Sequence, residues 1–409
     1  MDQASNVAFA DDREIPTLSV LGALVSERLA PPDVDPAQWP EIIPAALRHG
    51  LGPMLWWELK QHPVEKAPQW EPLEWAFWRT AAQQIRFEYA QAQVQTALAE
   101  ADIPALWIKG SALAHTIYPK PSLRPMCDLD VLVPYDRREA AFEVVTQLGY
   151  HFPASGAYLL AMDDAITQKL THHYHLRGGP GDGISLELHF RLLGRDTTLL
   201  PPEQMAWMWD QTDTFTDGSH RYLTLRPEAH LLYLSAHAIL QHGESISVLR
   251  HYFDLHRLVG QSPIDWTLVL QQAVALKWTY AVERALALAV RFFETPVPQM
   301  VLEQLGDRRP MDENVARAIH LQDQGTRWEH MQLALGPLSV TEKARLTVQV
   351  VFPRPAYMRQ RYGIQASRTV WPAYVYRWMD QGRVVGWWMW KAAALRWGRH
   401  RRSRTRGES

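Results

Sequence analysis

Cysteine is almost absent from this chain of 409 residues, in which Cys127 stands alone. A single cysteine cannot form an intrachain disulfide, which is typical of proteins in a reducing compartment. No uncharged apolar run reaches the length of about 18 residues that a membrane-spanning helix needs. The N-terminal sequence MDQASNVAFADDREIP is acidic and lacks the basic and apolar parts of a secretory signal. We therefore expect a cytoplasmic protein.

The chain also lacks an excess of charge of either sign, because its formal net charge is only −2. No nucleic-acid or acidic partner is predicted by that balance. The C-terminal end differs: from Lys391 onward, seven Lys and Arg residues face one acid, Glu408. We expect a last packing helix followed by a basic tail with no partner. The alternative is that the tail contacts the inner face of a membrane or nucleic-acid phosphates.

The apolar fraction of 47% is that of a packed globular chain, and the length predicts two or three domains. Helical spacing and good helix formers dominate the first 100 residues, above all in residues 70–100. Short strands follow, and helices return from about residue 201. We expect an N-terminal helical region at 1–100, a strand-containing core at 101–195, a helical domain at 196–350, and Trp-rich helices with the basic tail at 351–409.

The segment IPALWIKGSALAHTIYPKPSLRPMCDLDVLVP (residues 103–134) holds the most informative pattern. Two apolar runs, ALWI and LDVLV, bracket a turn-rich stretch. Asp128 and Asp130 are two residues apart, so on a strand both carboxylates project from one face. Residues of the other phase, Cys127 among them, are expected to be buried.

A second half-polar strand is predicted at residues 184–193, ISLELHFRLL. Its apolar residues alternate with polar ones, and Glu187 and His189 fall on the polar face. A sheet pairing that sets Glu187 beside Asp128 and Asp130 would place three acids around one point. We expect His189 to orient Glu187 or to contact an acceptor. The preceding GGPGDG is predicted to be a hairpin turn.

Three strand carboxylates suit hard divalent cations such as Mg²⁺ or Mn²⁺, which prefer oxygen ligands. The turn formed by Gly110 lets the backbone approach phosphate closely, and Ser111 offers a hydroxyl. Lys109 and Arg124 are placed to neutralise charge as a phosphate bond breaks. These parts predict a site for metal ions and a nucleoside triphosphate.

Other polar residues leave alternatives open. Arg250 and Asp254, spaced i,i+4, are expected to form a helix-surface or interdomain pair. The alternative is that Arg250 faces the substrate. The three histidines of HHYH, whose spacing matches no common zinc motif, serve in hydrogen bonding, surface exposure or transition-metal binding: His172, His173 and His175. His237 and His242 on a predicted helix are expected to be core or edge residues.

The motifs LWIKGSALAHTIYP…LRPMCDLDVLVP and HHYHL…ISLELHFRL resemble bacterial nucleotidyltransferases of the DNA polymerase-β-like superfamily. The resemblance extends over most of residues 40–260. It implies an α+β fold, with a small mixed β-sheet nucleotidyltransferase core and extensive N- and C-terminal helical regions. By position, it makes Asp128, Asp130 and Glu187 the catalytic metal ligands, and Gly110 with Ser111 the phosphate-binding turn. This chain departs from the family pattern in having a lysine, Lys109, before the glycine.

The activity that the resemblance implies is transfer of a nucleoside monophosphate from an NTP to an acceptor, with release of pyrophosphate. The acceptor is a small molecule, a peptide or protein, or RNA. The alternative is a non-catalytic nucleotide-binding or scaffold protein on the same fold.

Overall fold

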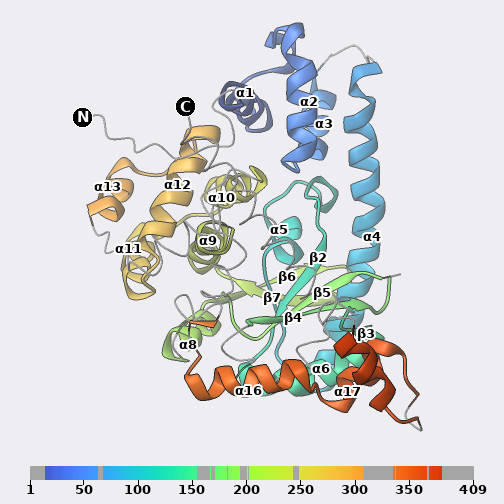
Figure 1. Ribbon diagram of the computed structural model, residues 1–409. Helices are drawn as coiled ribbons and strands as arrows, with labels where there is room; N and C mark the ends of the chain where they lie inside the picture. The colour runs from blue at the N-terminus through green and yellow to red at the C-terminus, as the bar shows by residue number, and fades with distance from the viewer. Residues whose placement is uncertain are drawn as a thin grey trace, which may run out of the picture. The chain divides into compact units, whose positions relative to one another are not determined.

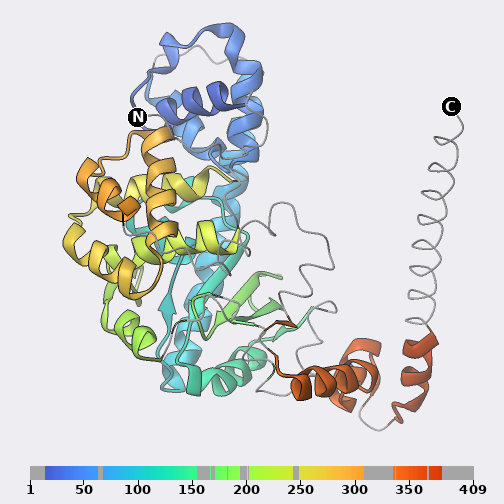
Figure 2. The ribbon, with the colours of Figure 1, turned by 60° about the vertical axis from the view of Figure 1, so that its left-hand side comes forward.

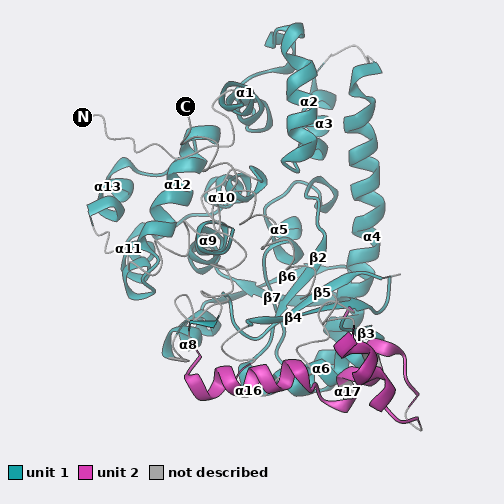
Figure 3. Ribbon diagram, viewed as in Figure 1, with its two compact units in different colours: residues 1–152, 169–337 teal, residues 153–168, 338–409 magenta. Residues whose placement is uncertain are grey.

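The computed structural model of this chain describes residues 14–62, 68–153, 166, 171–181, 183–193, 200, 202–242, 248–307, 335–336, 338–365 and 368–379. The chain divides into two compact units, shown in different colours in Figure 3. One comprises Met1–Phe152 and Lys169–Pro337, the other Pro153–Gln168 and Leu338–Ser409. The boundaries expected at residues 101 and 196 lie inside the first unit, and the one expected at residue 351 lies inside the second.

A mixed sheet of seven strands lies at the centre of the first unit (Figure 1), in the order β3-β4-β5-β2-β1-β7-β6. The strands are β1 (Leu106–Trp107), β2 (Asp128–Leu132), β3 (Tyr150–His151), β4 (His173–Gly178), β5 (Ser185–His189), β6 (Thr212–Asp217) and β7 (His220–Leu225). The pairs β2–β5 and β1–β7 are parallel, and the other neighbours are antiparallel. With the helices around it, this sheet confirms the predicted α+β fold. The predicted hairpin between β4 and β5 is also confirmed.

Helices precede the sheet, as the sequence predicts. They are α1 (Ile15–Val25), α2 (Trp39–Arg48), α3 (Gly52–Gln61) and α4 (Glu71–Glu100). α4 extends well beyond the sheet in Figures 1 and 2; α2 and α3 pack against its far part, and α1 packs against α2 and α3. Its buried stripe recurs every seven residues, which keeps it on one side of the helix: Leu73, Thr80, Phe87 and Val94. Two shorter helices, α5 (Gly110–Thr116) and α6 (Arg138–Gln147), follow β1 and β2.

The helices after the sheet form a second layer of the first unit. They are α9 (Pro227–Ala236), α10 (Arg250–Gln261), α11 (Trp266–Ala275), α12 (Thr279–Phe293) and α13 (Gln299–Asp307), whereas α8 (Pro202–Asp210) lies between β5 and β6 in the chain. A π-helical segment, η7 (His237–Gln241), continues α9. Short 3₁₀ turns occur at Pro31–Asp33, Pro36–Gln38, Pro68–Trp70, Pro121–Leu123 and Tyr135–Arg137. The N-terminal helix α1 packs against α12 of this layer. Arg28, three residues after the end of α1, donates hydrogen bonds to the carbonyl of Phe292 and to the carboxylate of Glu294.

The hairpin of β6 and β7 corrects the sequence analysis, which assigned the chain after residue 201 to helices alone. Threonine occupies every second position of β6, and the two strands also carry Phe215 and Tyr222; both residue types favour β structure. Gly218 and Ser219 form the tight two-residue turn between the paired residues Asp217 and His220, and Gly218 has a φ of 56°. β7 pairs with β1 at the centre of the sheet, so the sheet extends beyond the predicted core.

The second unit contains α16 (Val340–Val351), which starts at a capping box of Ser339 and Glu342, and α17 (Pro355–Tyr362). The basic tail from Lys391 lies outside the described residues, and so do both alternatives for it, including contact with a membrane or nucleic acid. Within the described ranges, no helix is both long and apolar enough to cross a membrane.

Candidate active site

The three predicted acids lie on two neighbouring parallel strands. In the pairing of β2 with β5, Asp130 is opposite Glu187 and Asp128 is opposite Ser185. The intervening residues are fully buried, as the alternation predicts: Leu129, Val131, Leu186 and Leu188. The parallel pairing therefore brings the acid of β5 beside the two acids of β2.

Lys109 joins two of these acids through its ammonium group. Its Nζ donates to Asp130 Oδ1 at 2.7 Å and to Glu187 Oε2 at 3.3 Å. Although burial disfavours the charged form, Asp130, Tyr233 and Glu187 raise the pKa of Lys109 well above its ordinary value. Its backbone, with φ of 49° and ψ of −133°, occupies a region that favours glycine. Such strain, on the order of 1–3 kcal/mol, is typical of functional positions.

His189 holds the same two acids from the side of β5. Its ring is fully buried, and its Nε2 donates to Asp130 Oδ1 at 3.0 Å and lies 3.2 Å from Glu187 Oε2. Burial and Lys109 oppose protonation, but the hydrogen bonds to both carboxylates raise the pKa of His189. Against the opposing effect of burial, His189 and Lys109 hold the pKa of Glu187 well below its usual range. The structure thus places His189 where it orients Glu187.

Asp128 differs from the other two acids, because no cation pairs with it in the described part of the chain. Burial, followed by repulsion from Asp130 and Glu187, raises the pKa of Asp128 to about 7. Asp130, Glu187 and His189 offer ligand atoms within 4.8 Å of one another. Carboxylate oxygens are the ligands that a hard divalent cation prefers. The residues present therefore fit Mg²⁺ or Mn²⁺.

The two residues of the predicted phosphate-binding turn, Gly110 and Ser111, have different roles in the structure. Gly110 lines the cavity, and a side chain there would collide with the guanidinium of Arg124 and the sulfur of Met126. Ser111 is fully buried, and its Oγ accepts from the backbone N–H of Asp130 at 2.8 Å. The hydroxyl of Ser111 therefore anchors β2 beneath the acids and does not line the cavity.

Arg124 reaches the cavity through a buried ion pair with α10. Its Nε and Nη2 donate to the two oxygens of Asp254 at 2.9 and 2.7 Å. The hydroxyl of Tyr118 donates to the same carboxylate at 2.7 Å. Despite burial, Arg124 holds the pKa of Asp254 below its usual value. The expected pair of Arg250 with Asp254 is thus wrong, because Asp254 bonds to Arg124 across 130 residues of sequence.

Arg250, at the first turn of α10, is a further cation of the cavity wall, beside Lys109 and Arg124. Its buried Nε has no hydrogen-bond partner within the described residues. Burial, reinforced by the neighbouring Arg124, lowers the pKa of Arg250 from its ordinary value. A guanidinium in this position is suited to bind an anionic group of a ligand.

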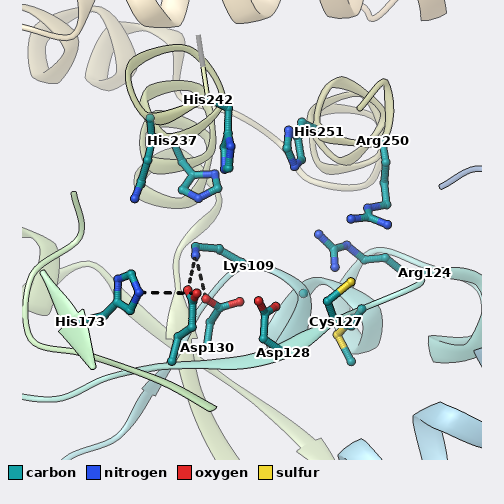
Figure 4. Close-up of a pocket in the computed structure, with 14 residues that line it drawn as sticks. Lys109, Arg124, Cys127, Asp128, Asp130, His173, His237, His242, Arg250 and His251 are labelled. Atoms are coloured by element: carbon teal, nitrogen blue, oxygen red, sulfur yellow. Dashed lines mark hydrogen bonds and ion pairs between the residues drawn. The ribbon is translucent and has the colours of Figure 1, made fainter. Parts of the chain in front are cut away.

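The acids and these cations surround a cavity of about 260 Å³. Figure 4 shows the acids on the strand side, with histidines and Arg250 facing them from helices. Cys127 also lines the cavity and is exposed, so the prediction that it is buried is wrong. The reason is that Cys127 precedes the first residue of β2, where the alternation of the strand does not yet apply.

Three cavity histidines were missed as site residues, because the sequence pointed to core or edge positions for two of them. His237 and His242 are five residues apart, which an α-helix places on different faces. The π-helical turn of η7 realigns them, and their ring centroids lie 4.6 Å apart. His251 of α10 lies 5.3 Å from His242, and burial lowers the pKa of all three. The sequence shows that His237, His242 and His251 are close along the chain, but no sequence pattern predicts the π-helical turn that brings the first two together.

The histidines of HHYH lie at the other end of the acid row. His173 and His175 of β4 come within 3.6 and 3.7 Å of Glu187 Oε1. His172 Nε2 lies within hydrogen-bonding distance of Gln241 Nε2 and of His173 Nδ1, at 2.8 Å from each. Burial lowers the pKa of His173 to about 3. His172 and His173 are placed for hydrogen bonding beside the acids, and His172, His173 and His189 also offer ligand atoms within 4.8 Å of one another, so transition-metal binding stays a prediction.

Comparison of this sequence with models of known protein families gives a match. Residues 35–294, more than half of the chain, match a family described as uncharacterised nucleotidyltransferase. A comparison with curated proteins gives no match. Among solved structures, the crystal structure of an antigenic nucleotidyltransferase-like protein from Paracoccidioides brasiliensis is similar, with 16% sequence identity and a TM-score of 0.33. That similarity covers 54% of this chain and 92% of the other.

Proposed function

The chain belongs to a family described as uncharacterised nucleotidyltransferases, and from this premise we propose that it transfers a nucleoside monophosphate from an NTP to an acceptor. One observation carries the proposal: Asp128, Asp130 and Glu187 meet at a cavity whose opposite wall holds Arg250. Carboxylates for cations on one side and a guanidinium for phosphate on the other match the two needs of nucleotidyl transfer.

In the proposed reaction an acceptor oxygen or nitrogen forms a bond to the α-phosphorus of the NTP. The bond from that phosphorus to the bridging oxygen of the β-phosphate breaks, pyrophosphate leaves with the electron pair, and the acceptor's proton passes to solvent. Asp128, Asp130 and Glu187 would hold Mg²⁺ or Mn²⁺, which supplies charge neutralisation for the phosphates. The acceptor presents a hydroxyl, phosphate or amine, and belongs to a small molecule, a protein or RNA.

The remaining residues hold the site in shape and bind phosphate. Lys109 and His189 fix the oxygens of Asp130 and Glu187 through hydrogen bonds of 2.7–3.3 Å. Such fixed groups need little rearrangement when charge develops on the phosphates. Arg124, aligned by Asp254, and Arg250 offer N–H donors to phosphate oxygens from the helix side.

The test is transfer of label from α-³²P-labelled NTPs to components of a cell extract, with Mg²⁺ or Mn²⁺ present. We expect a labelled acceptor and released pyrophosphate. The double variant Asp128→Ala, Asp130→Ala should lower labelling by at least about 1,000-fold, because it removes two of three ligands. Asp213→Asn, which changes an exposed carboxylate on β6, is the matched control. Undiminished labelling by the double variant would refute the proposal.

A non-catalytic nucleotide-binding protein is the second candidate, and the position of Lys109 favours it. The ammonium bonded to Asp130 and Glu187 already balances charge that a metal ion would balance. On this alternative, calorimetry gives NTP binding that is independent of Mg²⁺, and no extract yields labelled product. Lys109→Met separates the two: it should strengthen the dependence of NTP binding on Mg²⁺ if the lysine substitutes for the ion.

A further inference from the structure

A second group of metal-binding side chains lies outside the cavity, where α4, α5 and β6 meet. Glu88 of α4, His115 of α5 and Asp217 of β6 offer ligand atoms within 4.8 Å of one another. All three side chains are half-buried, and none of them lines the cavity. The three residues are far apart in the sequence, so they come together only in the tertiary fold.

The charges in this group are unbalanced. In the described part of the chain, neither Glu88 nor Asp217 forms an ion pair with a lysine or arginine. Burial, with the added effect of Asp217 and Glu88, raises the pKa of the neighbouring Tyr222 to about 12. Two carboxylates held close together without a cation repel each other, so this place favours a bound positive ion.

Neighbouring side chains fix the group and supply a fourth polar atom. The ring of His115 stacks on Phe215, with centroids 5.6 Å apart and planes inclined by 20°. Gln84, one turn before Glu88 on α4, donates to Glu88 Oε1 at 3.2 Å and lies 3.3 Å from His115 Nε2. Rotation of the Gln84 amide by half a turn presents its carbonyl oxygen to the same point.

We propose that Glu88, His115 and Asp217 bind one divalent transition-metal ion, for which Zn²⁺ is the best fit. An imidazole selects Zn²⁺ over Mg²⁺, and two carboxylates with the Gln84 carbonyl or a water complete four-coordination. The ion ties α4 and β6 to the last turn of α5. Because Lys109 is the N-cap of α5, the ion also steadies the helix from which Lys109 extends. This inference is independent of the proposed function.

The experiment uses the full chain, freed of metal with EDTA and titrated with Zn²⁺ against a chromophoric chelator. The variant Asp130→Asn, His173→Ala serves as background, so that neither the acids of the cavity nor the group of His172, His173 and His189 competes for the ion. We expect one equivalent of Zn²⁺, and loss of at least about 100-fold in affinity on adding His115→Ala or Asp217→Asn. Adding Asp213→Asn, an exposed acid of the same strand, should leave the affinity unchanged.

Unchanged Zn²⁺ affinity in both His115→Ala and Asp217→Asn would overturn the proposal, and so would an equal loss in Asp213→Asn. Should His115→Ala fail to fold by circular dichroism, Co²⁺ bound to the background protein gives a second readout. Its visible absorption should report a nitrogen- and oxygen-ligated ion and change on adding Asp217→Asn. A Co²⁺ spectrum identical in the two proteins would also overturn it.

Discussion

Replacement of Asp254 by asparagine should destabilise the first unit strongly. The carboxylate is 1% exposed and accepts three hydrogen bonds, two from Arg124 and one from Tyr118. Two unit charges about 4 Å apart interact by about 4 kcal/mol at an effective dielectric constant of 20. Removal of one member of a buried pair costs about 3–5 kcal/mol, because the other charge stays buried. We expect Asp254→Asn to lower the free energy of unfolding by about 3–5 kcal/mol.

The assay is urea unfolding followed by tryptophan fluorescence, with Asp213→Asn as the exposed control. A loss below about 1 kcal/mol, or an equal loss in the control, would refute the reasoning. The double variant Arg124→Met, Asp254→Leu should be less destabilised than Asp254→Asn, since no unpaired charge from the pair remains. The folded pKa of Asp254 is lowered, so its contribution is present at neutral pH and fades as pH falls below about 4.

Three further changes test the strand face and the turn. Asp128→Asn should raise the free energy of unfolding at pH 8 by about 2–4 kcal/mol, and less at pH 4. The reason is that Asp128 has a pKa of about 7 in the folded protein, so its ionisation destabilises the fold as pH rises. Urea unfolding at a series of pH values will measure the free energy of unfolding of both proteins. Gly110→Ala should lower nucleotidyl transfer at least about tenfold through displacement of Arg124, whereas Gly260→Ala, which has open space around it, should not. Ser111→Ala should cost about 1–3 kcal/mol in urea unfolding by leaving a buried strand amide unpaired, and a rise in KM for NTP without that cost would contradict its anchoring role.

Local sequence patterns predicted the N-terminal helices, the strands β2 and β5, and the faces on which these two strands carry their acids. Alternation over five residues is enough to place Asp128 and Asp130 on one face, because side chains of a strand point alternately to its two sides. The same alternation put Glu187 and His189 on the polar face of β5. The hairpin of β6 and β7 was missed because its polar threonines give no clear apolar alternation, although the Gly-Ser pair at its turn was a usable signal.

Partners that are distant in the sequence were beyond local patterns. The pairing of Arg124 with Asp254, and the placement of Lys109 between Asp130 and Glu187, depend on how helices and strands pack. An i,i+4 spacing predicted a different partner for Asp254, but burial of α10 against the turn after α5 decided otherwise. Packing also turned the predicted phosphate ligand Ser111 into a buried anchor.

The sequence by itself determined which residues of this protein carry carboxylates on strand faces and which turn precedes them, because these features depend on neighbours along the chain. Only the tertiary structure decided the register that sets Asp130 opposite Glu187. It also decided the π-helical turn that aligns His237 with His242 and the meeting of Glu88, His115 and Asp217. Each of these depends on packing between segments far apart in the chain, and the free energy of that packing is not encoded in any short window of sequence.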